Sequence, residues 1–188
     1  MAREIEVKLK VEAHDPIRGR LRGLGAECLG SVNETNRLFD DAGDTLRRGD
    51  RGLRIRECRD DAGRITAAFL TYKGPRETSG LKQREELEVR IDDAATARAI
   101  LESLGYRAVI GFEKRRETWL LGGCHVELDE LPHLGAFVEV EGPSDAAIHA
   151  VQDQLGLAGE APVPETYIAL LARYCEEHGL PRDLIVFV

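Results

Sequence analysis

Apolar and charged side chains alternate along at least six segments of this chain, and this pattern constrains the fold more than any other feature. Residues 3–11 (REIEVKLKV) are the first of these segments. One side of the alternation is formed by Ile5, Val7, Leu9 and Val11. The other side is formed by Glu4, Glu6 and Lys8. Because successive strand residues point to opposite faces, each segment predicts a β-strand with one apolar and one charged face.

Strands and helices are expected to share the rest of the chain. Further strands are predicted over 51–58, 65–74, 82–91, 107–120, 124–130 and 135–142, with a weaker candidate over 31–40. Helices are predicted from Asp15 to Gly25, over 92–105, over 144–155 and from about 165 to 177, from their capping residues and apolar periodicity. With no repeat and no linker, we expect a single domain over 1–188. Its tunnel strands would span about 3–142 and its C-terminal helices about 144–178. A short tail, "DLIVFV", would follow as an added strand, an interface or a frayed end.

Composition narrows the classes of function. The chain has 188 residues and a formal charge of −8, which argues against general binding to nucleic acid or to a membrane surface. No apolar run approaches 18 residues, and the four cysteines lack the spacing of a zinc site. The sequence therefore predicts a cytoplasmic protein with reduced thiols, no nucleic-acid partner and no membrane span.

The charged faces either meet solvent or point into a closed barrel. Solvent-facing strands usually mix small polar residues with lysine, whereas these faces concentrate Glu, Asp and Arg. A closed antiparallel sheet has no exposed edge, and the predicted helices could cover its apolar outer face. We therefore expect a barrel with a charged interior.

The charges in that interior fall into two chemical sets. Carboxylates suited to a hard cation, Mg²⁺ or Mn²⁺, are supplied by Glu4, Glu6, Asp129, Glu139 and Glu141. Cations suited to phosphate oxygens are supplied by Lys8, Arg54, Arg56, Lys73, Lys114 and Arg116. A metal ion next to a clamp of basic side chains that holds phosphate is typical of enzymes that catalyse phosphoryl or nucleotidyl transfer. No Walker loop or GxGxxG motif is present, so side chains would have to hold the phosphates.

These same residues resemble the CYTH superfamily, the triphosphate tunnel metalloenzymes. Its ExExK signature is matched by "EIEVK" (4–8). Further matches follow in order: "LRIR" (53–56), "TYKGP" (71–75), "REELE" (84–88), "EKRRETW" (113–119), "ELDEL" (127–131) and "LGAFVEVE" (134–141). Tyr167 matches an aromatic residue of the last helix. One departure is Leu38-Phe39, where relatives often begin an aromatic pair with Tyr.

The resemblance implies an α+β fold, a closed eight-stranded antiparallel β-barrel around a triphosphate tunnel with helices packed outside. Metal ligands would be Glu4, Glu6, Asp129, Glu139 and Glu141. The triphosphate clamp would be Lys8, Arg54, Arg56, Lys73, Lys114 and Arg116. On the same tunnel face, Arg84 would join the substrate-binding residues, while Glu86 and Glu88 would bind metal or orient the basic residues. Catalytic roles fall to Lys8, Glu6 and Asp129.

The expected activity is hydrolysis of a triphosphate with Mg²⁺ or Mn²⁺, with inorganic triphosphate placed first. A class IV adenylate cyclase, which would convert ATP to cyclic AMP and pyrophosphate, is the alternative. It ranks second because no adenine-reading element is visible in the sequence. Thiamine triphosphate hydrolysis and binding of polyphosphate or nucleotide without turnover come next. The resemblance also allows a homodimer.

Overall fold

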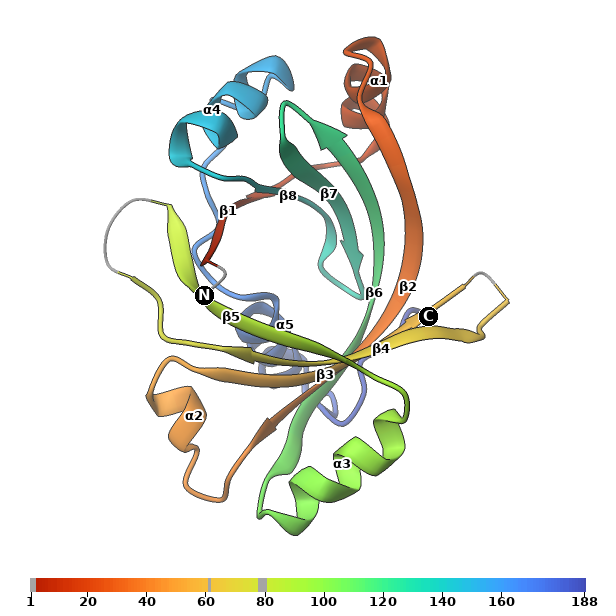
Figure 1. Cartoon of the computed structure of the whole chain (residues 1–188), viewed down its shortest axis with the longest axis vertical. Coiled ribbons are helices and arrows are strands. Elements are labelled where there is room, and N and C mark those ends of the chain that lie inside the picture. Colours follow the sequence, from red (N-terminus) through yellow and green to blue (C-terminus); the bar gives the residue numbers. More distant parts are fainter. Residues whose placement is uncertain (1–2, 61, 78–80) are drawn as a thin grey trace.

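The computed structural model describes residues 3–60, 62–77 and 81–188, without the side chains of Arg3, Glu4 and Lys82. Its strands are β1 (Arg3–Lys10), β2 (Glu27–Asp40), β3 (Gly52–Arg59), β4 (Ile65–Lys73), β5 (Lys82–Ile91), β6 (Arg107–Leu121), β7 (Cys124–Leu131) and β8 (Gly135–Glu141). They pair antiparallel in a closed barrel, in the order β1-β5-β4-β3-β2-β6-β7-β8 (Figure 1). The predicted eight-stranded barrel is therefore confirmed.

The described helices are α1 (Asp15–Gly23), α2 (Thr45–Arg48), α3 (Ala94–Ser103), α4 (Asp145–Gln154) and α5 (Tyr167–His178). None of them, within the part of the chain that the structure covers, is long and apolar enough to cross a membrane. Side chains cap the start of three helices: Asp93 before α3, Ser144 before α4 and Thr166 before α5. The strand and helix order matches the sequence prediction apart from α2, which was not expected.

The apolar outer face of the barrel is covered by helices where the sequence predicted it. Val7 and Leu9 of β1 pack with Val138 and Val140 of β8 beneath α1 and α4, in a cluster that also includes Trp119. A second cluster under α3 is centred on Phe39, Ile55 and Leu101. Figure 1 shows α1 and α4 on one side of the ring of strands and α3 on the other. Burying this face stabilises the barrel and turns the alternate, charged side chains inward.

Helix α5 is placed differently, because it packs into one end of the barrel. Tyr167, Leu170 and Leu171 contact a cluster formed by Leu38, Phe112, Leu131 and Phe137. Those four residues continue the inner faces of β2, β6, β7 and β8, two positions along from charged or polar residues. Figure 1 shows α5 behind the ring of strands. One end of the interior is therefore apolar and filled.

The tail after α5 adds a short stretch of sheet beside β6. Ile185 bridges Phe112 in parallel, with Ile185 N donating to Gly111 O at 2.9 Å and Glu113 N donating to Ile185 O at 2.9 Å. A Cβ on Gly111 would lie 2.5 Å from Asp183 O, so this approach needs glycine. Among the three alternatives for the tail, these contacts favour a short added strand over a frayed end.

The unexpected helix α2 depends on a buried carboxylate at the end of β2. Asp40 is 3% exposed, and its carboxylate oxygens accept hydrogen bonds from Leu46 N at 3.0 Å and Arg47 N at 2.9 Å. These are amides of the first turn that would otherwise lack acceptors. The helix is thus held by a residue outside it, in a stretch whose sequence reads as a polar turn.

Candidate functional site

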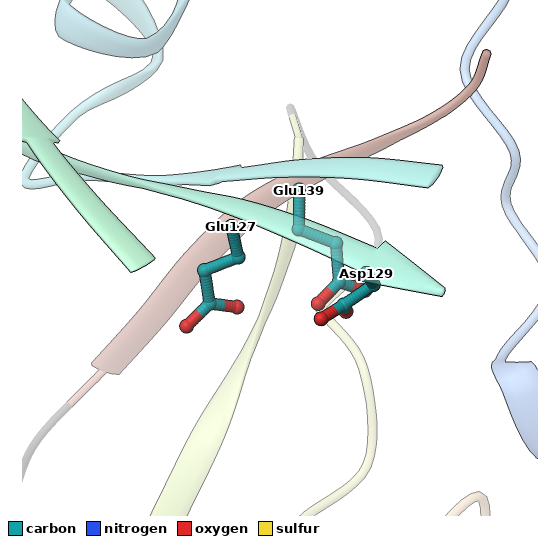
Figure 2. Close-up of side chains that lie close together, drawn as sticks. All are labelled: Glu127, Asp129 and Glu139. Carbon is teal, nitrogen blue, oxygen red and sulfur yellow. The ribbon is translucent and has the colours of Figure 1, made fainter. Parts of the chain in front are cut away.

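Three carboxylates converge in the barrel interior and form what we term the acidic group: Glu127 and Asp129 of β7 and Glu139 of β8. One carboxylate oxygen of each lies within 4.8 Å of the others (Figure 2). The register of the sheet causes this, since Glu127 lies opposite Glu139 and Asp129 is two residues farther along the same face. Three oxygen donors at this spacing fit a hard divalent cation such as Mg²⁺ or Mn²⁺.

Arg116 contacts every member of the acidic group. Its Nε donates to Asp129 Oδ1 at 2.6 Å, and its Nη2 donates to Glu139 Oε2 at 2.7 Å. Nη1 pairs with Glu127. These carboxylates raise the pKa of Arg116 well above its ordinary value against the opposing effect of burial. The pKa of Glu127 rises to about 8, first because of burial, and the neighbouring carboxylates add to the rise while Arg116 opposes it.

Lys8 lies between the acidic group and the helix that fills the end of the barrel. Its Nζ is 3.5 Å from Glu139 Oε1, donates to Glu165 O at 2.9 Å and lies 4.0 Å from the centre of the Tyr167 ring. The Tyr167 hydroxyl donates to Asp129 Oδ2 at 3.0 Å. Burial and then the charge of Asp129 raise the pKa of Tyr167 well above its ordinary value, so the phenol keeps its proton. The resemblance matched Tyr167 to the family, and its place beside Lys8 and Asp129 is a finding of the structure.

The other inward-facing cations, from β3, β4, β5 and β6, form what we term the basic wall: Arg54, Arg56, Lys73, Arg84 and Lys114. Lys114 joins the wall to the acidic group, because its Nζ lies 3.4 Å from Asp129 Oδ2. Carboxylates hold several of its members. Arg56 Nη2 lies 3.0 Å from Glu88 Oε1, Lys73 Nζ lies 2.7 Å from Glu86 Oε2, and Arg54 Nη2 lies 3.8 Å from Glu88 Oε2. Of the two roles foreseen for Glu86 and Glu88, these contacts favour orientation of the basic residues over metal binding.

Three guanidinium nitrogens of the basic wall point to an anionic ligand. Arg54 Nε, Arg56 Nε and Arg84 Nε are buried, and no hydrogen-bond partner for them exists among the described residues. A buried donor without an acceptor is costly, and native proteins keep few of them. Phosphate oxygens would satisfy all three through charge-assisted hydrogen bonds.

The other predicted metal ligands lie farther along the barrel. Glu6, which is 6% exposed, is opposite Glu141 across β1 and β8, two register positions from the pair Lys8 and Glu139. The structure places Glu6 and Glu141 on the inner face, outside the acidic group. The side chain of Glu4 is outside the described part of the structure. Metal binding by these three residues stays a prediction.

Two inner carboxylates were not among the predicted site residues. Glu127 shares a face with Asp129 in "ELDEL", so the alternation carried a signal for it. Glu34 of β2 lies opposite Lys114 of β6 and is 2% exposed. Its neighbours Thr35 and Asn36 are polar too, so alternation gave no indication of the face on which Glu34 lies.

Comparison with known proteins agrees with this geometry. A family model, the CYTH domain, matches residues 2–167, and the chain therefore belongs to the CYTH family. A relative named "Putative adenylate cyclase" from Methanocaldococcus jannaschii is 32% identical over 138 residues, 73% of this chain and 75% of that protein.

Solved structures share the fold. A protein from Pyrococcus horikoshii OT3 has a TM-score of 0.77 and 28% identity, and the match covers 91% of this chain and 99% of that one. A Hippeastrum protein named "Putative adenylyl cyclase" and described as having a dominant triphosphatase activity has a TM-score of 0.67 at 18% identity, with 91% and 96% covered. The second likeness concerns the fold alone.

Proposed function

We propose that this protein is a hydrolase that cleaves a triphosphate with the help of Mg²⁺ or Mn²⁺, with inorganic triphosphate as the first substrate to test. The observation that carries the proposal is the arrangement of the barrel interior. An oxygen-only group of three carboxylates lies in one part, and buried guanidinium nitrogens without partners among the described residues lie in another. A metal-bound triphosphate matches both halves in charge and in hydrogen bonding.

Different residues of this chain would then bind the metal and the phosphate groups. Glu127, Asp129 and Glu139 would hold the metal, with Glu6, Glu141 and Glu4 as further ligands. When bound, the metal would polarise phosphate oxygens and orient the water. The basic wall would bind the phosphate oxygens and stabilise the charge that develops on them. Lys8, fixed by Glu165 O and Glu139, would position the phosphoryl group that is transferred.

A class IV adenylate cyclase is the second candidate, favoured by the name of the Methanocaldococcus relative. In that reaction the ribose 3′-hydroxyl attacks the α-phosphorus of ATP and pyrophosphate leaves. Both reactions need the same clamp and metal. They differ in which phosphorus faces the nucleophile and in the need for a pocket that holds adenosine.

One panel of assays separates the candidates. The purified protein is incubated with inorganic triphosphate, thiamine triphosphate, ATP or GTP and with Mg²⁺ or Mn²⁺, and phosphate, pyrophosphate and cyclic AMP are measured. We expect phosphate release from inorganic triphosphate that stops when EDTA removes the metal. Cyclic AMP as the main product would replace the hydrolase with the cyclase. Tight binding without any product over long incubation would show a non-catalytic binding protein.

A further inference from the structure

The structure places a carboxylate, Glu34, among the cations of the basic wall. Glu34 Oε1 lies 3.3 Å from Arg56 Nη1, and Glu34 Oε2 lies 3.3 Å from Lys114 Nζ. The Asn36 amide Nδ2 donates to Glu34 Oε2 at 3.2 Å. Strand β2 lies between β3 and β6, so an inward side chain of β2 is positioned to contact both neighbouring strands. Glu34 thus bridges two members of the basic wall.

Glu34 stays ionised in this position. Burial alone would raise its pKa, but the charges of Lys114, Arg116 and Arg56 outweigh burial and lower the pKa well below its ordinary value. An ionised carboxylate 3.3 Å from two cations cancels part of their attraction for any other anion. A surface selected only for tight phosphate binding would exclude such a group.

The contacts of Arg56 show what Glu34 adds in return. Its Nη1 is held by Glu34, its Nη2 by Glu88, and its guanidinium carbon lies 5.0 Å from the centre of the Phe69 ring. These contacts fix the plane of the guanidinium group and leave Nε without a partner among the described residues. Lys114 is held similarly, between Glu34 and Asp129 Oδ2 at 3.4 Å.

We propose that Glu34 is a positioning residue of the basic wall: it orients Arg56 and Lys114 and limits the affinity of the wall for phosphate, so that cleaved product is released. This inference rests on the proposed function. It makes a prediction of unusual sign, because removing the charge of Glu34 should strengthen binding of the anion while slowing turnover. A residue that serves folding alone would not produce that combination.

The test compares Glu34→Gln with the wild type and with Glu57→Gln. Glu57 is a matched control, because it also contacts two arginines, Arg37 at 3.3 Å and Arg59 at 3.4 Å, but from the outer face of β3. Binding of inorganic triphosphate is measured by calorimetry in EDTA, where no metal supports turnover, and kcat is measured with Mn²⁺. For Glu34→Gln we expect Kd to fall and kcat to fall by about tenfold each, as one charge contact changes. Glu57→Gln should stay within about twofold in both, as for a substitution outside the site.

A second variant, Glu34→Asp, separates charge from geometry and serves if Glu34→Gln does not fold. The shorter side chain keeps the charge but cannot reach both cations, so Kd should stay near that of the wild type while kcat falls. Unchanged kcat in both variants, or weaker binding by Glu34→Gln, would overturn the role of Glu34 while leaving the proposed function in place. Failure of the wild type to bind inorganic triphosphate would instead defeat the proposed function and this inference together.

Discussion

The inner and outer faces of β2 and β6 both carry many charges, yet they differ in how those charges are satisfied. On the outer face, a groove of about 580 Å³ is lined by Arg18, Arg115, Glu117 and Glu130, among others. Arg18 donates from Nε and Nη2 to Glu117, and Arg115 pairs with Glu130 directly across from it. On the inner face, Lys114 and Arg116 converge with residues of other strands around the acidic group.

Only the inner face, among the described residues, combines dense charge with buried donors that have no acceptor. The outer charges pair with one another. Arg115 and Glu130 are 55% and 46% exposed, so water screens the attraction between them. The basic wall, in contrast, contains buried guanidinium nitrogens whose N–H groups have no hydrogen-bond acceptor among the described residues. Buried donors without an acceptor among the described residues, more than the density of charge, distinguish the inner face from the outer face.

Val7→Asp should cause the largest loss. Val7 is 4% exposed in the outer core beneath the helices, so an aspartate there buries a charge with no partner. We expect the free energy of unfolding to fall by about 4 kcal/mol or more, or folding to fail. Urea unfolding measures this. Leu87→Asp is the control, because Leu87 is 51% exposed on the outer face of β5 and should tolerate the charge. A stable Val7→Asp protein would mean that β1 faces the other way.

Glu6→Ala and Glu141→Ala should remove most metal-dependent turnover while leaving the fold intact. The two residues lie opposite each other on the inner face, and deleting one of two like charges relieves repulsion. Turnover of inorganic triphosphate against Mn²⁺ concentration and thermal unfolding are the measurements. Near-wild-type activity at saturating metal in either variant would exclude that residue as a ligand and leave the acidic group to bind the metal alone.

Lys8→Ala should reduce kcat by about a hundredfold, the range for losing one preorganised charge contact. Lys8→Arg should recover only part of that loss, because a planar guanidinium does not fit where Nζ packs over Tyr167 and meets Glu165 O. Lys10→Ala is the matched control, an exposed lysine two positions along the same strand. If the Lys8→Ala and Lys10→Ala proteins both turned over as fast as the wild type, Lys8 would have no part in the reaction.

Arg56→Ala should weaken substrate binding and slow the reaction together, by about tenfold in KM and in kcat, as loss of a charge-assisted phosphate contact does. Arg18→Ala removes an arginine of similar pairing from the outer groove and should change neither constant. Steady-state kinetics on both variants tests the contrast between the two faces. Equal effects, or none in Arg56→Ala, would place Arg56 outside the substrate site.

Glu127→Gln should change the pH dependence of stability without a large change in stability at low pH. The pKa of Glu127 is about 8 in the folded protein against an ordinary 4.5, so the folded state keeps a proton that the unfolded state has lost between those values. The stabilisation of the folded state by protonated Glu127 is complete below about pH 4.5 and is lost as the pH rises towards 8. We therefore expect the melting temperature, measured in EDTA from pH 5 to 9, to fall less steeply with pH in Glu127→Gln than in the wild type. An identical slope would show that Glu127 is ionised throughout.

The sequence predicted the barrel because alternation is strict where both faces are buried. In β1, Val7 and Leu9 pack beneath helices, whereas Glu6 and Lys8 lie on the inner face opposite Glu141 and Glu139 of β8. A single pattern therefore specifies both faces. Strand β2 was weak for the opposite reason. Its outer face lines the polar groove, and Asn33 and Thr35 are as polar as the inner Glu34 and Asn36. Alternation could not reveal Glu34.

Other features depended on contacts between distant parts of the chain. Helix α5 has an ordinary apolar stripe, which indicates that one face is buried but not that it fills the end of the barrel against Phe112 and Phe137. Helix α2 is four residues long and is held by the carboxylate of Asp40, so its own propensity gave no signal. The convergence of Arg116 with all three acidic residues also required the register of β6, β7 and β8.

Closure of the barrel sets an order on folding. Strand β1 pairs with β5 and β8, and Lys8 O accepts from Val163 N, so its neighbours follow it in the sequence by about 80 to 160 positions. Contacts between such distant segments carry a large loop-closure entropy and form late. During synthesis, β1 must therefore wait as an unpaired strand while the rest of the sheet is made. The alternating Glu and Lys residues that later line the interior are the kind of charges that keep an unpaired edge from joining another chain.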